Sequence, residues 1–427
     1  MNKNLKILYD YKDIPICILI FVMLFFPTIY VPIKFTILFI ILVWVSKEYL
    51  TTYKLAMDYK IFTYSCANIV SCVFFTIWGV MNNTPGALRT TTVYIIYPII
   101  YTYIIASNIK GVTFQKMLIA IVITGLLIGL YCIYSILYFI DIIPAGLYFE
   151  LPLDQAMGIY DGFFEFRIYS LSSLIFIVPL LIGILFYYDK NVINVSKRLI
   201  QFTLLIDMIV VLLSARKGLY VATLFSFPII FVLKNDKASK FKWEVIISVI
   251  FLIIFIQLVS LFLEIDYSRY IDDFKAGFEF DNTGNESAYV RTQQFNALIN
   301  GWKESPWLGR GIGASASFQS SYEQPWAYEL TYLALLFQIG IIGMMIITYS
   351  YLKILIINYI NIKKNSDYLT PVIAPFFIAT ICFLIANATN PYLAKFDYLW
   401  IMFLPIATAN YYSLKAKHSI EKDGKTK

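Results

Sequence analysis

The chain has 427 residues, of which 59% are hydrophobic and only 14% are charged, and its mean hydropathy is +0.71. A water-soluble protein of this length needs much more polar surface, so the composition excludes a soluble enzyme and a disordered chain. The same shortage excludes a nucleic-acid-binding protein, despite a formal net charge of +7. These properties are typical of a polytopic membrane protein.

A membrane-spanning helix needs about 20 largely apolar residues, and the chain contains twelve runs of this kind. The first run follows Lys3, Lys6 and Lys12 without a small-residue cleavage site, so we expect an uncleaved anchor. We therefore predict an all-α polytopic membrane protein with about 12 transmembrane helices. The predicted spans cover residues 14–31, 33–47, 61–80, 91–108, 117–140, 168–188, 199–214, 218–234, 245–264, 328–352, 371–389 and 397–413.

The distribution of lysine predicts the orientation of these spans. With the N-terminus in the cytoplasm, most lysines fall in cytoplasmic connections and both termini are cytoplasmic. The predicted organisation is nine spans over 1–264, a large extracytoplasmic loop over 265–327, three spans over 328–413 and a cytoplasmic tail over 414–427. The loop mixes aromatic, charged and glycine residues and is too long for a simple connection, so we expect a small helical cap with a functional role.

The arginines do not follow the lysines. Six of the seven fall on the predicted outer side, namely Arg89, Arg167, Arg216, Arg269, Arg291 and Arg310. A guanidinium group is always charged and binds phosphate or carboxylate through a rigid, bidentate fork. The pattern indicates an anionic ligand on the outer face, with salt bridges to outer acidic residues as the alternative.

The cysteine and histidine residues do not indicate a disulfide or metal site. The only histidine, His418, lies in the polar tail, and there is no CxxC pair. We therefore expect no disulfide framework, no metal site and no cofactor. The five cysteines, all in apolar runs, are Cys17, Cys66, Cys72, Cys132 and Cys382.

Two short segments place cations where a span meets the outer face. Arg216 and Lys217 lie between the seventh and eighth spans, with almost no loop around them. They suit a phosphate at the depth of the lipid headgroups, although such cations also extend toward headgroups without a specific ligand. Arg167, at the start of the sixth span, lies at the same depth and could instead pair with Glu165 or Asp161.

The large loop contains a third candidate. An amphipathic stretch begins near Arg291 and ends before a run of three glycines, at 309, 311 and 313, that surrounds Arg310. Glycines beside an arginine would let backbone amides approach an anion. A plain turn is the alternative. The run is not a dinucleotide-binding motif, because no strand precedes it.

A carboxylate at the end of a membrane helix is the fourth candidate. Glu329 stands at the start of the tenth span, and Tyr332, three residues later, shares its helix face. Glu329 could act as a general base near the arginines or could simply cap the helix. Asp207, in the middle of the seventh span, is a further candidate, although pairing with another helix would also explain it.

In these segments the sequence resembles the O-antigen ligase and O-antigen polymerase superfamily of bacterial envelope polysaccharide synthesis, best over roughly residues 167–343. Three motifs carry the resemblance: Ser214-Ala215-Arg216-Lys217-Gly218; Arg291 followed by Trp302, Pro306, Gly309, Gly311 and Gly313; and Glu329-Leu330-Thr331-Tyr332-Leu333 followed by Gly340 and Gly343. The ligases carry histidine where this chain has Glu329, so the resemblance favours a polymerase. It implies the all-helical GT-C type of fold.

The resemblance also implies a metal-independent, inverting glycosyltransferase in the bacterial inner membrane that acts on oligosaccharide linked to undecaprenyl diphosphate. Fixed arginines would stabilise the charge of the departing diphosphate, and a carboxylate would activate the acceptor hydroxyl. The predicted catalytic residues are Arg216, Arg291 and Glu329. The predicted substrate-binding residues are Arg167, Lys217, Arg310 and Tyr332.

The resemblance also suggests binding partners, and several other functions remain as alternatives. Membrane lipid and a chain-length regulator protein are candidate partners, whereas nucleic acid is not. The loop aromatics could stack on sugars or form the core of the cap; they are Tyr289, Trp302, Trp307, Tyr322 and Trp326. The alternative functions are a ligase that transfers glycan to lipid A core, a flippase for lipid-linked sugars and a structural membrane subunit. A flippase is less favoured, because no repeat is visible in the sequence.

Overall fold

The computed structural model of the protein describes residues 13–52, 56–108, 111–151, 155–160, 163–214, 216–234, 286–319, 321–365 and 367–425. The predicted ninth span, 245–264, and Arg269 lie outside these residues. The described chain is built of helices apart from one short hairpin, so the prediction of a helical fold is confirmed.

The N-terminal part begins with helices whose starts follow from the local sequence. The Asp58 carboxylate accepts a hydrogen bond from the Lys60 N–H at 2.9 Å and so caps the third of them. Pro15 stands in the first turn of the first helix, where its missing N–H is no loss. These helices are α2 (Ile14–Phe25), α3 (Val31–Thr52), α4 (Tyr59–Met81), α5 (Ala87–Thr91), the π-helical η3 (Thr92–Ile96), α6 (Tyr97–Asn108) and α7 (Gly111–Phe139).

The middle part contains the one feature that differs in type from the prediction. Strands β1 (Gln155–Tyr160) and β2 (Phe163–Ile168) form an antiparallel hairpin in which Gln155 faces Ile168. Here we expected only a connection followed by a span from residue 168. The helices of this part are η4 (Ala145–Leu147), η5 (Tyr169–Ser173), α8 (Leu174–Phe186), α9 (Lys197–Leu213) and α10 (Lys217–Leu233).

The C-terminal part contains the helix of the large loop and the last apolar helices. The first of them, α13, lies in the segment 265–327 that we predicted as an extracytoplasmic loop, and the last, α17, continues well beyond the predicted span end at residue 413. The helices are α13 (Glu286–Glu304), α14 (Thr331–Lys363), α15 (Thr370–Ala386), η6 (Tyr392–Ala394), α16 (Phe396–Leu399), η7 (Trp400–Phe403) and α17 (Leu404–Lys425).

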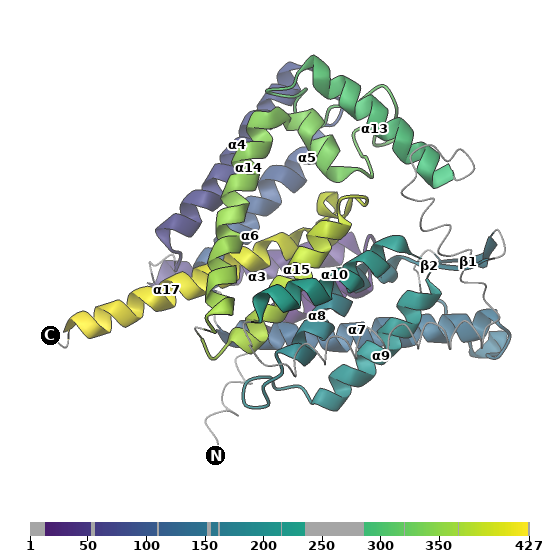
Figure 1. The fold of residues 1–427 in the computed structure, drawn as a ribbon, viewed down its shortest axis with the longest axis horizontal. Helices are drawn as coiled ribbons and strands as arrows, with labels where there is room; N and C mark the ends of the chain where they lie inside the picture. Colours follow the sequence, from purple (N-terminus) through teal and green to yellow (C-terminus); the bar gives the residue numbers. More distant parts are fainter. Residues whose placement is uncertain are drawn as a thin grey trace.

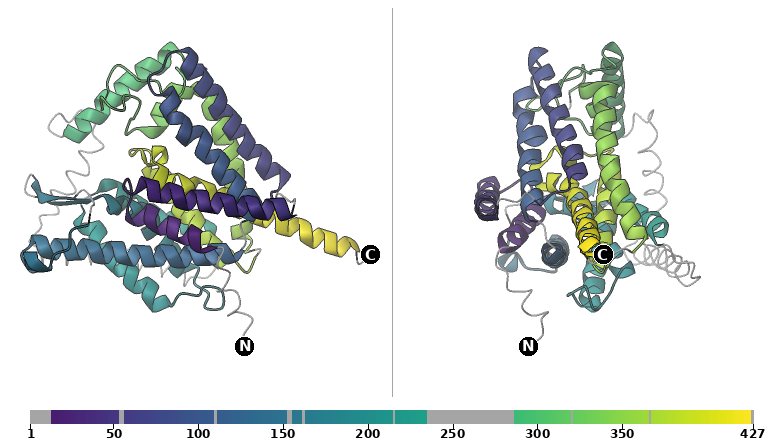
Figure 2. Two further views of the ribbon diagram at one scale, coloured as in Figure 1. Left: turned by 180° about the vertical axis from the view of Figure 1, so that it is seen from behind. Right: turned by 90° about the vertical axis from the view of Figure 1, so that its left-hand side faces the viewer.

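The core lies around α8 and α15, whose residues are almost all buried. The two helices approach so closely that a Cβ added to Gly183 would lie 3.0 Å from the Pro375 Cα. Helices α4, α5, α6 and α14 run together in one direction, and α7, α8, α10 and α15 cross below them (Figures 1 and 2). Helix α13 runs along the upper edge of the molecule toward the end of α4 (Figure 1).

Several of these helices could cross a membrane. Among the described residues, α4, α7 and α14 are long and apolar enough to do so. Four shorter apolar helices cover Ile14–Phe25, Ser170–Phe186, Lys217–Leu233 and Thr370–Ala386. Every predicted span other than 245–264 overlaps at least one described helix, and 91–108 and 397–413 each cover three helical elements. The number of helices that cross the membrane stays a prediction.

Helix α14 is broken near its start, and the break is repaired by the large loop. Gly340 has φ 60° and ψ −172°, a conformation outside the helical region. The N–H groups of residues 341–342 donate to the carbonyls of 306–307, at 2.9 and 3.1 Å. The N–H groups of 310–311 donate in turn to the carbonyls of 337–338, at 3.1 and 2.7 Å. The loop thus satisfies the backbone groups that the break releases, as a helix in an apolar environment requires.

Candidate functional site

Two of the predicted catalytic residues form an ion pair. Arg291, in the second turn of α13, donates from Nε to Oε2 of Glu329, which lies just before α14, at 2.9 Å. The Glu329 N–H donates to Oε1 of the buried Gln294 at 2.9 Å, so α13 and the start of α14 are joined twice. The side chains of Arg291 and Glu329 are 26% and 39% exposed, which leaves both open to a ligand.

The third predicted catalytic residue joins this pair through Tyr392 of η6. Burial raises the pKa of Tyr392, Arg216 lowers it by its charge and by a hydrogen bond to the hydroxyl, and the charge of Glu329 raises it. The phenol ring is therefore close to both charges. A Cβ added to Gly218 would lie 3.2 Å from Asn390 Nδ2, so the start of α10 packs against this same connection.

A further cation, Lys395, lies beside this group and was not predicted. Its Nζ lies over the Tyr392 ring, 5.7 Å from the centroid. Burial lowers the pKa of Lys395, the nearby Asp397 raises it, and the charge of Arg216 lowers it. Asp397 already pairs with Lys34. Lys395 lies in a predicted outer connection. A cation on the outer face goes against the orientation rule, and we used this argument only for the arginines.

We refer to Arg216, Arg291 and Lys395, together with Glu329 and Tyr392, as the cationic cluster. Its members come from four places in the sequence: the residue before α10, the second turn of α13, the second residue before α14, and η6 with the residue that follows it. The cluster contains three cations and one carboxylate.

The remaining predicted binding residues are placed as follows. Lys217 is the first residue of α10 and is half-buried beside Arg216. The Tyr332 hydroxyl donates to the carbonyl of Leu384 at 2.6 Å, and Tyr332 lines the apolar pocket described below. Arg167 lies on β2, where it faces Ala156 in the hairpin, and only its backbone is described.

Arg310 lies outside the cluster. It pairs with Glu304, six residues earlier in the chain. The N–H groups of residues 309–312 all donate to backbone carbonyls, so they are not available to an anion. Gly311, at φ 97°, approaches α4 so closely that a Cβ would lie 2.3 Å from the Gly79 Cα. The structure therefore supports the plain-turn interpretation of the glycine run.

The loop aromatics divide into two sets. Trp302 donates from Nε1 to the Pro306 carbonyl at 3.2 Å and packs in the core between α13 and α14. Trp326 covers Gly86 and lies under Arg89, whose guanidinium is 5.7 Å from the ring centroid. These two tryptophans have structural roles. The exposed set is Tyr289, Trp307 and Tyr322.

Asp207 is a separate buried carboxylate. It is fully buried in α9, and neither carboxylate oxygen has a hydrogen-bond partner among the described residues. It packs against α7, where a Cβ added to Gly129 would lie 2.5 Å from Oδ1. No described interaction with another charged residue explains it.

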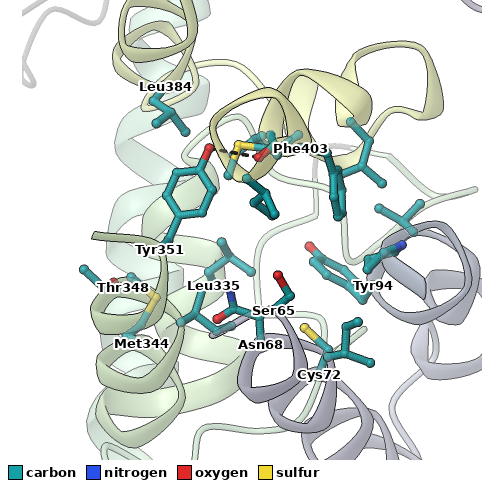
Figure 3. Close-up of a pocket in the computed structure, with 18 of the residues that line it drawn as sticks. Ser65, Asn68, Cys72, Tyr94, Leu335, Met344, Thr348, Tyr351, Leu384 and Phe403 are labelled. Carbon is teal, nitrogen blue, oxygen red and sulfur yellow. Dashed lines mark hydrogen bonds between the residues drawn. The ribbon is translucent and has the colours of Figure 1, made fainter. Parts of the chain in front are cut away.

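An apolar pocket of about 350 Å³ begins beside the cationic cluster. Its walls come from α4, η3, α6, α14 and η7, and side chains such as Cys72, Leu335 and Phe403 point into it (Figure 3). Its lining includes Thr331, two residues after Glu329, and Leu393, the neighbour of Tyr392. The pocket and the cationic cluster are thus built from neighbouring residues of the same two connections.

The described residues contain no group of three or more His, Cys, Asp or Glu side chains that could hold a metal ion. No protein-family model matches the chain, and no curated protein matches it. The fold and the site thus define a helical protein with helices long enough to cross a membrane and with a cationic cluster beside an apolar pocket.

Proposed function

We propose that this protein is a polymerase that joins oligosaccharide repeat units carried on undecaprenyl diphosphate into an O-antigen or capsule polysaccharide. The reaction takes place at the outer face of the bacterial inner membrane, and both termini are cytoplasmic. The observation that carries the proposal is the cationic cluster together with the apolar pocket, which is lined by the neighbouring residues Thr331 and Leu393. A lipid-linked diphosphate has the same two parts, a strongly anionic head and a long apolar chain.

The charges of the cluster favour an anionic ligand. Glu329 neutralises Arg291, whereas Arg216 and Lys395 lie close together, and the nearby Asp397 is held by Lys34. Like charges at close range in a partly buried site repel each other. A diphosphate between these cations removes that repulsion and accepts charge-assisted hydrogen bonds from the guanidinium forks.

The Arg291–Glu329 pair gives the cluster a way to respond to substrate. Phosphate competes with the Glu329 carboxylate for the Arg291 guanidinium, because both are bidentate oxygen ligands. When Arg291 turns to the diphosphate, the Glu329 carboxylate is released and can accept the hydroxyl proton. The base is thus activated only when the leaving group is in place.

The chemical step is then a direct displacement at the anomeric carbon. The acceptor hydroxyl oxygen attacks this carbon, and Glu329 takes the hydroxyl proton as general base. The bond from the anomeric carbon to the diphosphate oxygen breaks, and undecaprenyl diphosphate leaves with the electron pair. Arg216, Arg291 and Lys395 stabilise the charge that develops on it. Attack from the face opposite the leaving group inverts the anomeric centre.

The apolar pocket suits the polyprenyl chain of the carrier. Its lining is almost entirely hydrocarbon, with Leu335, Leu384 and Phe403 among the side chains that face it (Figure 3). A polyprenyl chain that enters from the bilayer exchanges contacts with lipid tails for packing contacts with these side chains. In this proposal the diphosphate end lies at the cationic cluster, next to the lining residues Thr331 and Leu393.

The proposal is tested by the glycan ladder of a deletion strain that carries wild-type protein, Glu329→Gln or Arg216→Ala. We expect wild type to restore a full ladder and both variants to leave single repeat units, at normal protein levels in the membrane. The matched control is Glu323→Gln, since Glu323 is exposed and only its backbone carbonyl has a contact in the described structure.

Other outcomes contradict the proposal in distinct ways. A full ladder in both variants would show that Glu329 and Arg216 are not part of the active site. Full-length chains that remain on undecaprenyl diphosphate in the deletion strain would identify a ligase, and a complete absence of repeat units outside the membrane would identify a flippase.

A further inference from the structure

A second pocket, of about 720 Å³, lies where the end of α4 meets α13 and the loop segment 309–317. In Figure 1 the end of α4 and α13 meet at the upper corner of the molecule. Its volume is within the range of pockets that bind small molecules, about 300–1,000 Å³. Unlike the apolar pocket, it is lined mainly by polar groups, among them the side chains of Asn82, Asn83, Asn300, Ser315 and Ser317.

Several lining groups have hydrogen-bonding capacity to spare. Four of these side chains have no hydrogen-bond partner within the described part of the chain: Asn83, Asn300, Ser315 and Ser317. The two charged lining residues, Glu304 and Arg310, neutralise each other. The pocket therefore offers uncharged donors and acceptors, which do not favour a phosphate.

We propose that this polar pocket binds sugar residues of the glycan, away from the reacting end; this inference rests on the proposed function. Each sugar hydroxyl both donates and accepts, and asparagine amides and serine hydroxyls can do the same. Trp78 adds a half-buried aromatic surface for the apolar C–H face of a sugar ring. Neither an ion nor a lipid chain suits this combination.

The pocket is held in shape by hydrogen bonds from its own walls. Trp78 donates from Nε1 to the Gly309 carbonyl at 3.2 Å, and Ser305 donates to the same carbonyl at 2.9 Å. Asn82 donates to the carbonyl of Arg310 at 3.3 Å. A preformed pocket loses little entropy when it binds a ligand. This reduces the cost of holding a flexible oligosaccharide.

The pocket also lies at a suitable distance from the cationic cluster. Arg291 belongs to the cluster and Asn300 to the pocket, and both are on α13. Nine residues of helix separate them by about 14 Å along the axis and by about half a turn around it. An oligosaccharide that joins the two sites must therefore pass around α13. Such a contact would select the sugar sequence and hold the growing chain.

The test measures binding of free repeat-unit oligosaccharide to the purified full-length protein in lipid nanodiscs, by calorimetry. The probe is released from the producing strain's own surface polysaccharide. We expect the double variant Asn300→Ala/Ser315→Ala to weaken binding about 10-fold through two lost hydrogen bonds. The matched control is Asn296→Ala, an exposed position of the same helix outside the pocket, which should bind as wild type does.

The outcomes separate this inference from the proposed function. Glu329→Gln should keep wild-type affinity for the probe while it loses the ladder, because the two sites are separate. If Asn300→Ala/Ser315→Ala and a second variant, Asn83→Ala, both bind like Asn296→Ala, or if wild type does not bind, the sugar pocket is refuted. If Glu329→Gln keeps its ladder while the pocket variants lose binding, the polymerase proposal fails and the pocket remains.

Discussion

Among the described residues, two ion pairs lie near the connection that carries η6, and their surroundings differ. The side chains of Lys34 and Asp397 are 0% and 6% exposed, against 26% and 39% for Arg291 and Glu329. Lys34 also donates to the Phe26 carbonyl at 2.6 Å, so its ammonium group is enclosed by partners. The Arg291–Glu329 pair has room for a ligand on its exposed side.

The comparison shows how the same chemistry can serve two roles. A buried pair with additional hydrogen bonds holds its geometry, because separation leaves a charge in an apolar environment. A half-exposed pair contributes about 0–1 kcal/mol to stability and can exchange partners at low cost. We infer that Lys34–Asp397 fixes the connection that carries Tyr392 and Lys395, whereas Arg291–Glu329 is available for substrate.

The largest expected effect is on folding. Lys34→Met should lower the free energy of unfolding by about 3–5 kcal/mol, because it leaves the Asp397 carboxylate buried without its cation. Thermal unfolding in detergent, followed by tryptophan fluorescence, measures this change.

The matched control for this variant is Lys47→Met, an exposed position of the same helix. It should change stability by no more than about 0.5 kcal/mol. Equal unfolding temperatures for the two variants would show that the buried pair is not structural.

For the half-exposed Arg291–Glu329 pair we expect a large effect on the reaction rate and a small effect on stability. Glu329→Gln should reduce the polymerisation rate about 100-fold or more, since a general base contributes that much, while the unfolding temperature stays near that of wild type. The rate is measured in membranes supplied with lipid-linked repeat units. A variant that unfolds as readily as Lys34→Met would give Glu329 a structural role instead.

A conservative change at Arg291 tests whether its guanidinium group binds the diphosphate. Arg291→Lys keeps the positive charge but loses the planar fork, so we expect about a tenfold loss of rate. Arg310→Lys, outside the cluster, should leave the rate unchanged. Equal effects of the two substitutions would contradict the separation of Arg310 from the phosphate site.

The smallest expected effect concerns pH. The pKa of Lys395 is lowered, chiefly by burial, so its charge is lost at a lower pH than that of an ordinary lysine. The unfolded chain binds more protons across that window, so the Lys395 contribution to stability rises with pH there. Binding of the anion weakens over the same window. Lys395→Arg should therefore extend activity to higher pH, and an unchanged alkaline limb of the pH–rate profile would remove Lys395 from the site.

The helices were the most predictable part of the fold. Apolar runs such as 61–80 and 117–140 coincide with α4 and α7, because length and hydropathy alone define an apolar helix. The hairpin of β1 and β2 was missed, since a two-stranded hairpin between spans has no such requirement. The break at Gly340 was also missed, because its backbone is satisfied by a loop about 30 residues away in the sequence.

The site was predictable in its residue types and less so in its contacts. The excess of outer arginines identified Arg216 and Arg291, and the position at the end of a span identified Glu329; the structure connects all three. Arg310 met the same criterion, but its pairing with Glu304 depends on the turn after α13, which composition does not reveal. Lys395 was overlooked because lysines were treated only as signals of orientation.

The repaired break in α14 also bears on how a lipid chain gains access to the apolar pocket. Residues 309–312 hydrogen-bond to carbonyls on both α14 and α4, at Gln338 and Phe75 among others, and so cross-link these two helices. Both helices line the pocket, and its lining also includes η3, a π-helical segment. We expect a long chain to be accommodated by displacement of η3 and α6, because the loop holds α4 and α14 together.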